Sequence, residues 1–405
     1  MVAAVQPPPR KPAGSPRALV ALLAFVLGIA TVPHRVCERD AGAWFNGDAA
    51  RTNALAASVA RWTSTDLALA TFSTGSRRYD GEWLFGTHMM AAMGFGQIAL
   101  DPETQPAVRE ESILRMERSL DAMLGAGART FDREAWGIDA IDSAKLAPGA
   151  KGDTGHVAYL GYAGLALGLH RVLRPNSRFA ETDDLVVAVL ARRIDASGTG
   201  FVETYPGEVY PVDNASALAA IALHARATKR GAPPALTKGL EAIKKHGTDA
   251  STGMLIQAVG TTDARPRDDA RASGTALAAY FLAFADENTS AALWRALERR
   301  QFRTVLGFGA MVEYPDGKGR GDVDSGPVVF GFGVSATGFA LGASRVHGDR
   351  DVFTALYATT HLFGAPFDDG GERTYATGGP LGDAILFAML TAPPAARLRK
   401  IGGVA

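Results

Sequence analysis

The segment 204–214, TYPGEVYPVDN, carries the residues best suited to acid–base chemistry. Its two prolines favour an extended path, since proline restricts its own φ and the residue before it. Glu208, Tyr210 and Asp213 therefore fall within one short stretch before a helical pattern begins. Two carboxyl groups and a phenol suit proton transfer because different surroundings can separate their pKa values. The alternative for Asp213 is an N-cap, a place that Asp often takes.

His156 is the second candidate for a proton carrier. It follows KGDTG at the start of a predicted helix. His88 holds a comparable place in the first predicted hairpin. The alternative for both is a buried, hydrogen-bonded structural histidine. His170, His224 and His347 instead fall near the ends of predicted helices, where a histidine can cap carbonyl groups.

A glycine-rich loop, GDVDSGP over 321–327, places Asp322 and Asp324 two residues apart. These carboxylates could point into a cleft, and Asp324 is our candidate for orienting a substrate. A partial calcium loop is one alternative, although the terminal glutamate of such loops is absent. A solvated loop braced by Arg320 is the other. No phosphate-binding glycine loop, nucleophile elbow or HExxH motif occurs in the chain.

Helical periodicity dominates the chain from about residue 50 and predicts an all-α fold. We expect twelve helices, at about 50–71, 83–99, 106–125, 153–173, 180–194, 213–228, 234–246, 269–285, 288–302, 330–346, 350–362 and 379–392. From 153–173 onward, every second one is rich in Gly, Ala and Ser and nearly uncharged, which is typical of a buried helix. The others are amphipathic. This alternation predicts an (α/α)6 toroid of six helical hairpins, with an irregular bundle or an α-solenoid as alternatives.

The connections that enter the small-residue helices are long and rich in acids and aromatic residues, as in YDGEWLFGTH and ERTYATGGPLGD. Inner helices of a toroid run in the same direction, so these connections should gather at one mouth. Six helix N-termini would meet there, and their free N–H groups favour anionic groups. The sequence therefore predicts a polar cleft where the inner helices begin.

The N-terminal segment predicts export and a membrane tether. Basic residues precede an apolar run from Ala18 to Val32, which has the layout of a secretory signal. No clear A-x-A site follows, so we favour an uncleaved anchor over a cleaved signal; a leader that never engages the secretion machinery is the alternative. We expect residues 1–40 to form the basic segment and anchor and 41–405 to form the toroid. The positive-inside rule would place the toroid outside the cytoplasm.

Composition narrows the classes of partner. Lys plus Arg equal Asp plus Glu at 42 each, and no basic stripe stands out, so nucleic acid is not an expected partner. Cys37 is the single cysteine, which rules out an internal disulfide and any cysteine-based zinc cage.

Gly155-His156 at the start of a small-residue helix, followed by the proline-rich segment ending VYPVDN, resembles the linalool dehydratase/isomerase-like domain family. The resemblance covers about residues 150–400 and implies an (α/α)6 barrel with cofactor-free lyase or isomerase activity. It also implies that His156 corresponds to an active-site histidine. The family enzyme has two cysteines that would fall at about Thr204 and Asp213, and neither is cysteine here.

Our leading hypothesis is an exported, membrane-tethered enzyme that needs no cofactor or metal. His156 and Asp213 would carry protons, and Glu208, Tyr210 and Asp324 would orient a small-molecule substrate. One alternative is a glycan-active enzyme, because sugar hydrolysis uses two carboxylates beside the scissile bond. Another is a non-catalytic binding protein.

Overall fold

The computed structural model describes residues 16–64, 67–317, 319, 321 and 326–401, and helices dominate it. Within these residues, twelve helices alternate between an outer and an inner layer. The inner helices are α4 (Arg77–Leu100), α8 (Val157–Leu173), α10 (Pro211–Thr228), α12 (Ala272–Leu282), α14 (Val334–Val346) and α16 (Gly379–Leu390). The outer helices are α3 (Ala49–Ser64), α5 (Pro106–Leu124), α9 (Ala180–Ala196), α11 (Pro234–Ala242), α13 (Glu287–Gln301) and α15 (Arg350–Gly364).

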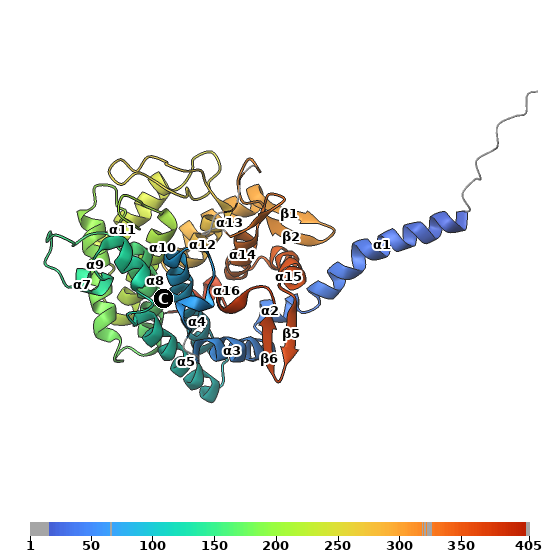
Figure 1. The fold of residues 1–405 in the computed structure, drawn as a ribbon, viewed down its shortest axis with the longest axis horizontal. Helices are drawn as coiled ribbons and strands as arrows, with labels where there is room; N and C mark the ends of the chain where they lie inside the picture. Colours follow the sequence, from blue (N-terminus) through green and yellow to red (C-terminus); the bar gives the residue numbers. More distant parts are fainter. Residues whose placement is uncertain (1–15, 65–66, 318, 320, 322–325, 402–405) are drawn as a thin grey trace, which may run out of the picture.

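The six inner helices form a closed ring around the centre of the molecule (Figure 1). Each packs on the next in chain order, from α4 to α8, α10, α12, α14 and α16, and α16 returns to α4. Outer helices cover the ring, and α3 closes it from outside by packing on both α4 and α16. The fold is therefore the predicted (α/α)6 toroid, and the closing contact between α16 and α4 excludes an open solenoid.

Small side chains bring the inner helices close together. Gly161, Gly164 and Gly168 form a stripe on one face of α8, at the spacing that repeats along a helix. A Cβ on Gly161 would lie 2.5 Å from Ser216 Oγ of α10, and a Cβ on Gly168 would lie 3.0 Å from Leu223 Cβ. Larger side chains would separate the two backbones, which explains the composition of these helices.

The connections hold elements that the periodicity did not predict. Short helices α2 (Ala41–Asn46), α6 (Thr130–Trp136), α7 (Ala140–Ala144) and α17 (Ala395–Leu398), the 3-10 helix η1 (Leu69–Thr71) and the π-helix η2 (Ile243–Gly247) accompany the ring. In the described part of the chain, the connections that enter α14 and α16 hold three antiparallel hairpins: β1–β2 (Phe302–Val305, Phe308–Met311), β3–β4 (Val328–Val329, Phe332–Gly333) and β5–β6 (Pro366–Asp369, Glu372–Tyr375). The prediction that YDGEWLFGTH forms a loop is wrong, because α4 begins at Arg77 and includes this segment.

The N-terminal helix α1 (Pro16–Glu38) leaves the toroid on the side of α15 and the hairpins β1–β2 and β5–β6 (Figure 1). It belongs to a stretch, Arg17–Asn46, that is long and apolar enough to cross a membrane, and the side chains of its apolar window are exposed.

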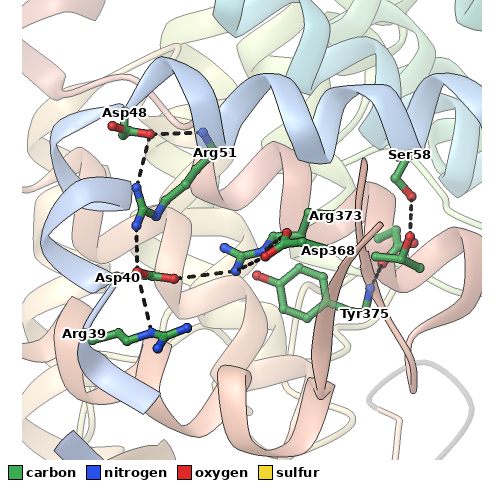
Figure 2. A network of polar contacts seen from close by, with 10 residues as sticks. Arg39, Asp40, Asp48, Arg51, Ser58, Asp368, Arg373 and Tyr375 are labelled. Atoms are coloured by element: carbon green, nitrogen blue, oxygen red, sulfur yellow. Dashed lines mark hydrogen bonds and ion pairs between the residues drawn. The ribbon is translucent and has the colours of Figure 1, made fainter. Parts of the chain in front are cut away.

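A polar network fixes the root of α1 to the toroid (Figure 2). Asp40, two residues beyond α1, accepts a hydrogen bond from Arg51 of α3 at 2.7 Å. Its other carboxylate oxygen lies 3.5 Å from Arg373 of β6, which also pairs with Asp368 of β5 at 3.0 Å. Asp40 and Arg373 are both buried, so the start of the toroid and the β5–β6 hairpin are joined by paired charges.

Candidate active site

A cavity of about 230 Å³ lies where the inner helices begin. All six inner helices contribute to its wall, mostly through residues of their first two turns, and α4 contributes residues further along the helix as well. Its lining comprises Glu82, Trp83, Phe85, Gly86, Met89 and Met90 of α4, Phe131, Ala158 and Tyr162, Tyr205, Tyr210, Val212 and Asp213, Gln257, Ser273, Gly274 and Leu277, and Phe339, Leu381 and Ile385. The tips of the inner helices thus assemble one cavity whose wall is largely apolar and includes two carboxylates.

Asp213 is the first of these carboxylates. Tyr210 precedes α10 as its N-cap residue and Pro211 takes the first helical position, so Asp213 lies in the first turn and does not cap the helix. Its side chain is buried against α8, where the Tyr162 hydroxyl donates to Oδ1 at 2.8 Å. A hydrogen bond to a carboxylate and the nearby helix N-terminus both favour the charged form. Asp213 is thereby set up as a proton acceptor.

Glu82 is the second carboxylate, and it was not among the candidates predicted from the sequence. It lies in the second turn of α4, and the hydroxyl of Tyr205 donates to its Oε1. Arg78 stacks on the Tyr205 ring at 3.5 Å and lies 3.6 Å from the Glu82 carboxylate. Burial, followed by the charge of Glu82, raises the pKa of Tyr205 well above its ordinary value, and the charge of Asp213 acts in the same direction. Tyr205 therefore keeps its proton.

The proline-rich segment 204–214 brings Tyr205 and Tyr210 to the cavity wall. Tyr205 and Glu208 pair across a tight turn in which Gly207 has a φ of +82°, a value that suits glycine. Buried Thr204 closes the loop, since its Oγ1 accepts from the Tyr210 backbone N–H at 3.0 Å. Tyr210 faces the cavity, whereas Glu208 is exposed beside it and accepts a hydrogen bond from the Tyr210 hydroxyl at 2.9 Å.

His156 is fully buried and does not line the cavity. Its Nδ1 lies 2.6 Å from Asp132 Oδ2, and its ring stacks on Trp136 at a centroid distance of 4.8 Å. Its Nε2 has no hydrogen-bond partner among the described residues. Burial raises the pKa of Asp132, although the hydrogen bond to His156 acts in the opposite direction. The neighbours Phe131 and Ala158 do line the cavity, so the His156–Asp132 pair lies behind its wall.

The backbone around His156 is held by a buried arginine. His156 has a φ of +63°, which is unusual for a non-glycine residue, and Gly155 before it has a φ of +60°. Arg193 of α9 donates to the Gly155 carbonyl oxygen at 3.0 Å and to Ser143 Oγ at 2.7 Å, and it pairs with Asp153 at 3.2 Å. These contacts hold the backbone of the strained turn in place and offset its cost.

Two further polar residues of the wall are Ser273, in the first turn of α12, and Gln257, in the connection that precedes α12. The Ser273 hydroxyl donates to the fully buried Glu313 carboxylate at 2.6 Å, and Gln257 faces the cavity nearby. Neither was a candidate, because an isolated Ser or Gln gives no pattern in sequence. The predicted candidate Asp324 and its neighbour Asp322 lie outside the described residues. His88 is buried within α4, and burial lowers its pKa to about 4, so it stays neutral.

One cluster among the described residues has the composition of a metal site. Atoms of Asp183, Asp184 and His224 come within 4.8 Å of one another. However, His224 Nε2 is already 2.7 Å from Asp184, and Arg171 lies 3.5 Å from the same carboxylate. The arginine supplies the positive charge that a cation would otherwise bring, and we interpret the cluster as an ion-pair network. It lies at the end of α10 remote from Asp213.

No family model matches the chain, and no curated protein matches it in sequence. Among solved structures, it is similar to a GH76 α-mannanase of Bacteroides thetaiotaomicron, with a TM-score of 0.47 and 12% identity over 78% of this chain and 87% of that chain. It is also similar to a family 76 glycoside hydrolase from a bovine strain of the same species, with a TM-score of 0.45 and 9% identity over 76% of this chain and 68% of that one. These likenesses assign no role to any residue of this chain.

Proposed function

We propose that the chain is an enzyme that breaks or rearranges a carbon–oxygen bond by carboxylate acid–base chemistry. The observation that carries this proposal is that Glu82 and Asp213, each held by a tyrosine hydroxyl, share one cavity at the tips of the inner helices. Two carboxyl groups in different surroundings are the means by which many enzymes separate an acid from a base.

In this proposal Asp213 is the base. The Tyr162 hydroxyl donates to its carboxylate, and a hydrogen bond of this kind favours the charged form that a proton acceptor needs. Glu82 is the acid in this proposal, and Tyr205, which keeps its own proton, holds the carboxyl group in place. Glu82 would have to take up a proton and pass it to the leaving oxygen, so that the carbon–oxygen bond breaks without a strongly basic leaving group.

A glycan-active enzyme is the first substrate class that fits. Two carboxylates beside the scissile bond are the common arrangement of glycoside hydrolases. Trp83 and Tyr210 add aromatic rings to the same wall. The enzyme would then transfer a glycosyl group to water or eliminate across the sugar ring.

A small alcohol is the second class. Leu277, Leu381 and Ile385, with the phenylalanine and methionine side chains, give much of the cavity an apolar wall. A volume of about 230 Å³ suits a compact molecule with an apolar body and one hydroxyl group. This is the substrate chemistry that the resemblance to the linalool dehydratase/isomerase-like family implies.

His156 and Asp324 keep secondary roles in the proposal. We assign His156, with Asp132, the task of fixing the wall that holds Phe131 and Ala158, and a proton transfer to the cavity would require movement of that wall. Tyr210 and Glu208 would orient the substrate at the rim, and Asp324 remains a proposed member of the site.

We also propose that the enzyme is tethered to a membrane through residues 18–32 of α1, with residues 41–405 as the toroid outside the cytoplasm. The support is the exposed apolar surface of α1 and the basic residues that precede it in the sequence.

The test is a turnover screen of full-length protein in nanodiscs against two panels, aryl and oligosaccharide glycosides and small tertiary or allylic alcohols. Products are identified by mass spectrometry with Asp213→Asn as the negative control. Turnover on one panel that the variant lacks supports the proposal and selects the substrate class. Ligand binding without turnover on either panel would support a binding protein instead.

A further inference from the structure

The exposed apolar side chains of the toroid are concentrated around the root of α1. Outside α1, the described chain has nine large hydrophobic side chains that are well exposed, and all but Leu114 lie between residues 305 and 367. Five of these belong to the elements that flank α1, and we call them the apolar collar: Val305, Leu306, Leu362, Phe363 and Phe367. Large exposed apolar side chains that gather on one side of a protein mark an interaction site.

The β1–β2 turn lies beside the end of the apolar stretch of α1. His34 follows that stretch after Pro33, and its ring packs edge-to-face on Phe308 at 5.6 Å. A Cβ on Gly307 would lie 2.6 Å from the His34 ring, so the turn touches the helix. Val305 and Leu306, about 60% exposed, therefore project at the level where the apolar part of α1 meets the toroid.

The end of α15 completes the collar. α15 packs on both α1 and β2, and Leu362 and Phe363 occupy its last turn. Phe367 follows in β5, whose hairpin is tied to Asp40 at the root of α1 through Arg373. Figure 1 shows α15, β1, β2 and β5 on the side from which α1 leaves, so the elements that carry the collar lie on the same side of the molecule as α1.

Exposed basic side chains border this face, together with Asp368 and Asp369 of β5. Arg35 lies in the last turn of α1 and Arg39 directly follows the helix; their side chains are 78% and 68% exposed. Arg303 of β1 is exposed next to the collar. Basic side chains at the boundary of an apolar segment interact with lipid phosphates, and nearby aliphatic and aromatic side chains enter the boundary between headgroups and acyl chains.

We propose that the apolar collar is a membrane-seating surface: it rests in the outer layer of the bilayer that α1 enters and fixes the orientation of the toroid. The occupant of the collar is lipid. This inference rests on the proposed tether and is independent of the proposed chemistry. It also gives the exposed β1–β2 turn a role that the ring architecture does not require.

The experiment uses the full chain with Cys37→Ser, reconstituted in vesicles of phosphatidylcholine with one third phosphatidylglycerol. Single cysteines at Leu306, Phe363, Leu114 or Leu23 carry a fluorophore, and nitroxide groups on the acyl chains act as quenchers. Leu114, the exposed apolar residue of α5, is the matched control away from the face, and Leu23 reports on α1 itself.

We expect severalfold stronger quenching at positions 306 and 363 than at 114, with the strongest quenching at 23. Quenching at 23 alone would leave the anchor in place and overturn the collar. Collar labels shielded from aqueous iodide but not quenched by lipid would indicate a second protein copy and would also overturn it. Absence of quenching at all positions would reject the tether and the collar together.

Discussion

His156 Nδ1 and Asp132 Oδ2 lie 2.6 Å apart with both side chains fully buried. Asp132 comes from the short helix α6, which also supplies Trp136 to the other face of the histidine. A buried pair of this kind is expensive to break, because removal of one partner leaves the other polar group without compensation. The pair therefore joins α6 to the start of α8 behind the cavity wall.

His156→Ala should destabilise the protein by about 3–5 kcal/mol, the range measured when one partner of a buried ion pair is removed. Chemical denaturation at pH 7 provides the measurement. His246→Ala, in the π-helix of the outer layer, is the control and should cost less than about 1 kcal/mol. Equal stabilities of the two variants would show that the pair does not support the fold.

Gly155→Ala should displace Trp136 and lower stability. A Cβ at this position would lie 2.0 Å from the Trp136 ring, and the backbone φ is +60°. Gly149→Ala is a matched control, since Gly149 also has a positive φ, +75°, but no atom near its Cβ position. Both variants carry a backbone cost of about 1–2 kcal/mol, so a further loss and a shift in tryptophan emission should appear only at 155. A common effect of the two changes would contradict the close packing.

Asp183 should make stability depend on pH. Burial raises the pKa of Asp183 to about 7, whereas the unfolded chain titrates near the ordinary value. Below both pKa values the proton is bound in both states; between them only the folded state holds it, so stability falls as pH rises from about 4 to about 7. The loss is about 1.4 kcal/mol per pH unit, on the order of 4 kcal/mol in total.

Asp183→Asn removes this titration. Denaturation of both proteins at pH 4 and pH 7.5 should show that the variant gains stability relative to wild type on going to the higher pH. Any fixed cost of the amide cancels in that comparison. A stability difference that stays constant with pH would refute the assignment.

Tyr162→Phe should shift the acidic limb of the kcat/KM profile to higher pH. The hydroxyl now stabilises the ionised form of Asp213, and its removal raises the pKa of the proposed base. Activity should recover at higher pH, because the carboxylate itself is retained. Tyr357→Phe, a buried tyrosine of α15 away from the cavity, should leave the limb in place.

The architecture followed from composition and periodicity. Small residues on alternate helices, such as the glycine stripe of α8, indicate the close packing of the inner helices. All twelve helices occur close to their predicted positions. The hairpins were not predicted because strands as short as 302–305 leave too few residues for a period-two pattern.

The site was harder to predict than the fold. The prolines drew attention to 204–214, and Tyr210 and Asp213 of this segment line the cavity. Glu82 was missed because its acidic character was attributed to a loop, although an acid in the second turn of an otherwise buried helix was a usable signal. Tyr162 and Tyr205 gave no signal, since their importance comes from which carboxylate they contact, and that depends on the ring geometry. The sequence also gave no sign that His156 faces Asp132 and Trp136, because those contacts connect separate elements.

The most direct test of the account compares kcat/KM for wild type, Asp213→Asn and Glu82→Gln on the substrate that the two panels identify. Asp195→Asn, an exposed change on α9, is the control. We predict losses of about 10²–10⁴-fold for each cavity variant, as expected for removal of a general acid or base, with wild-type activity for Asp195→Asn and folded ring structure in all. Turnover that persists in both cavity variants, or its absence from wild type on both panels, would contradict the claim that the helix tips form a carboxylate active site.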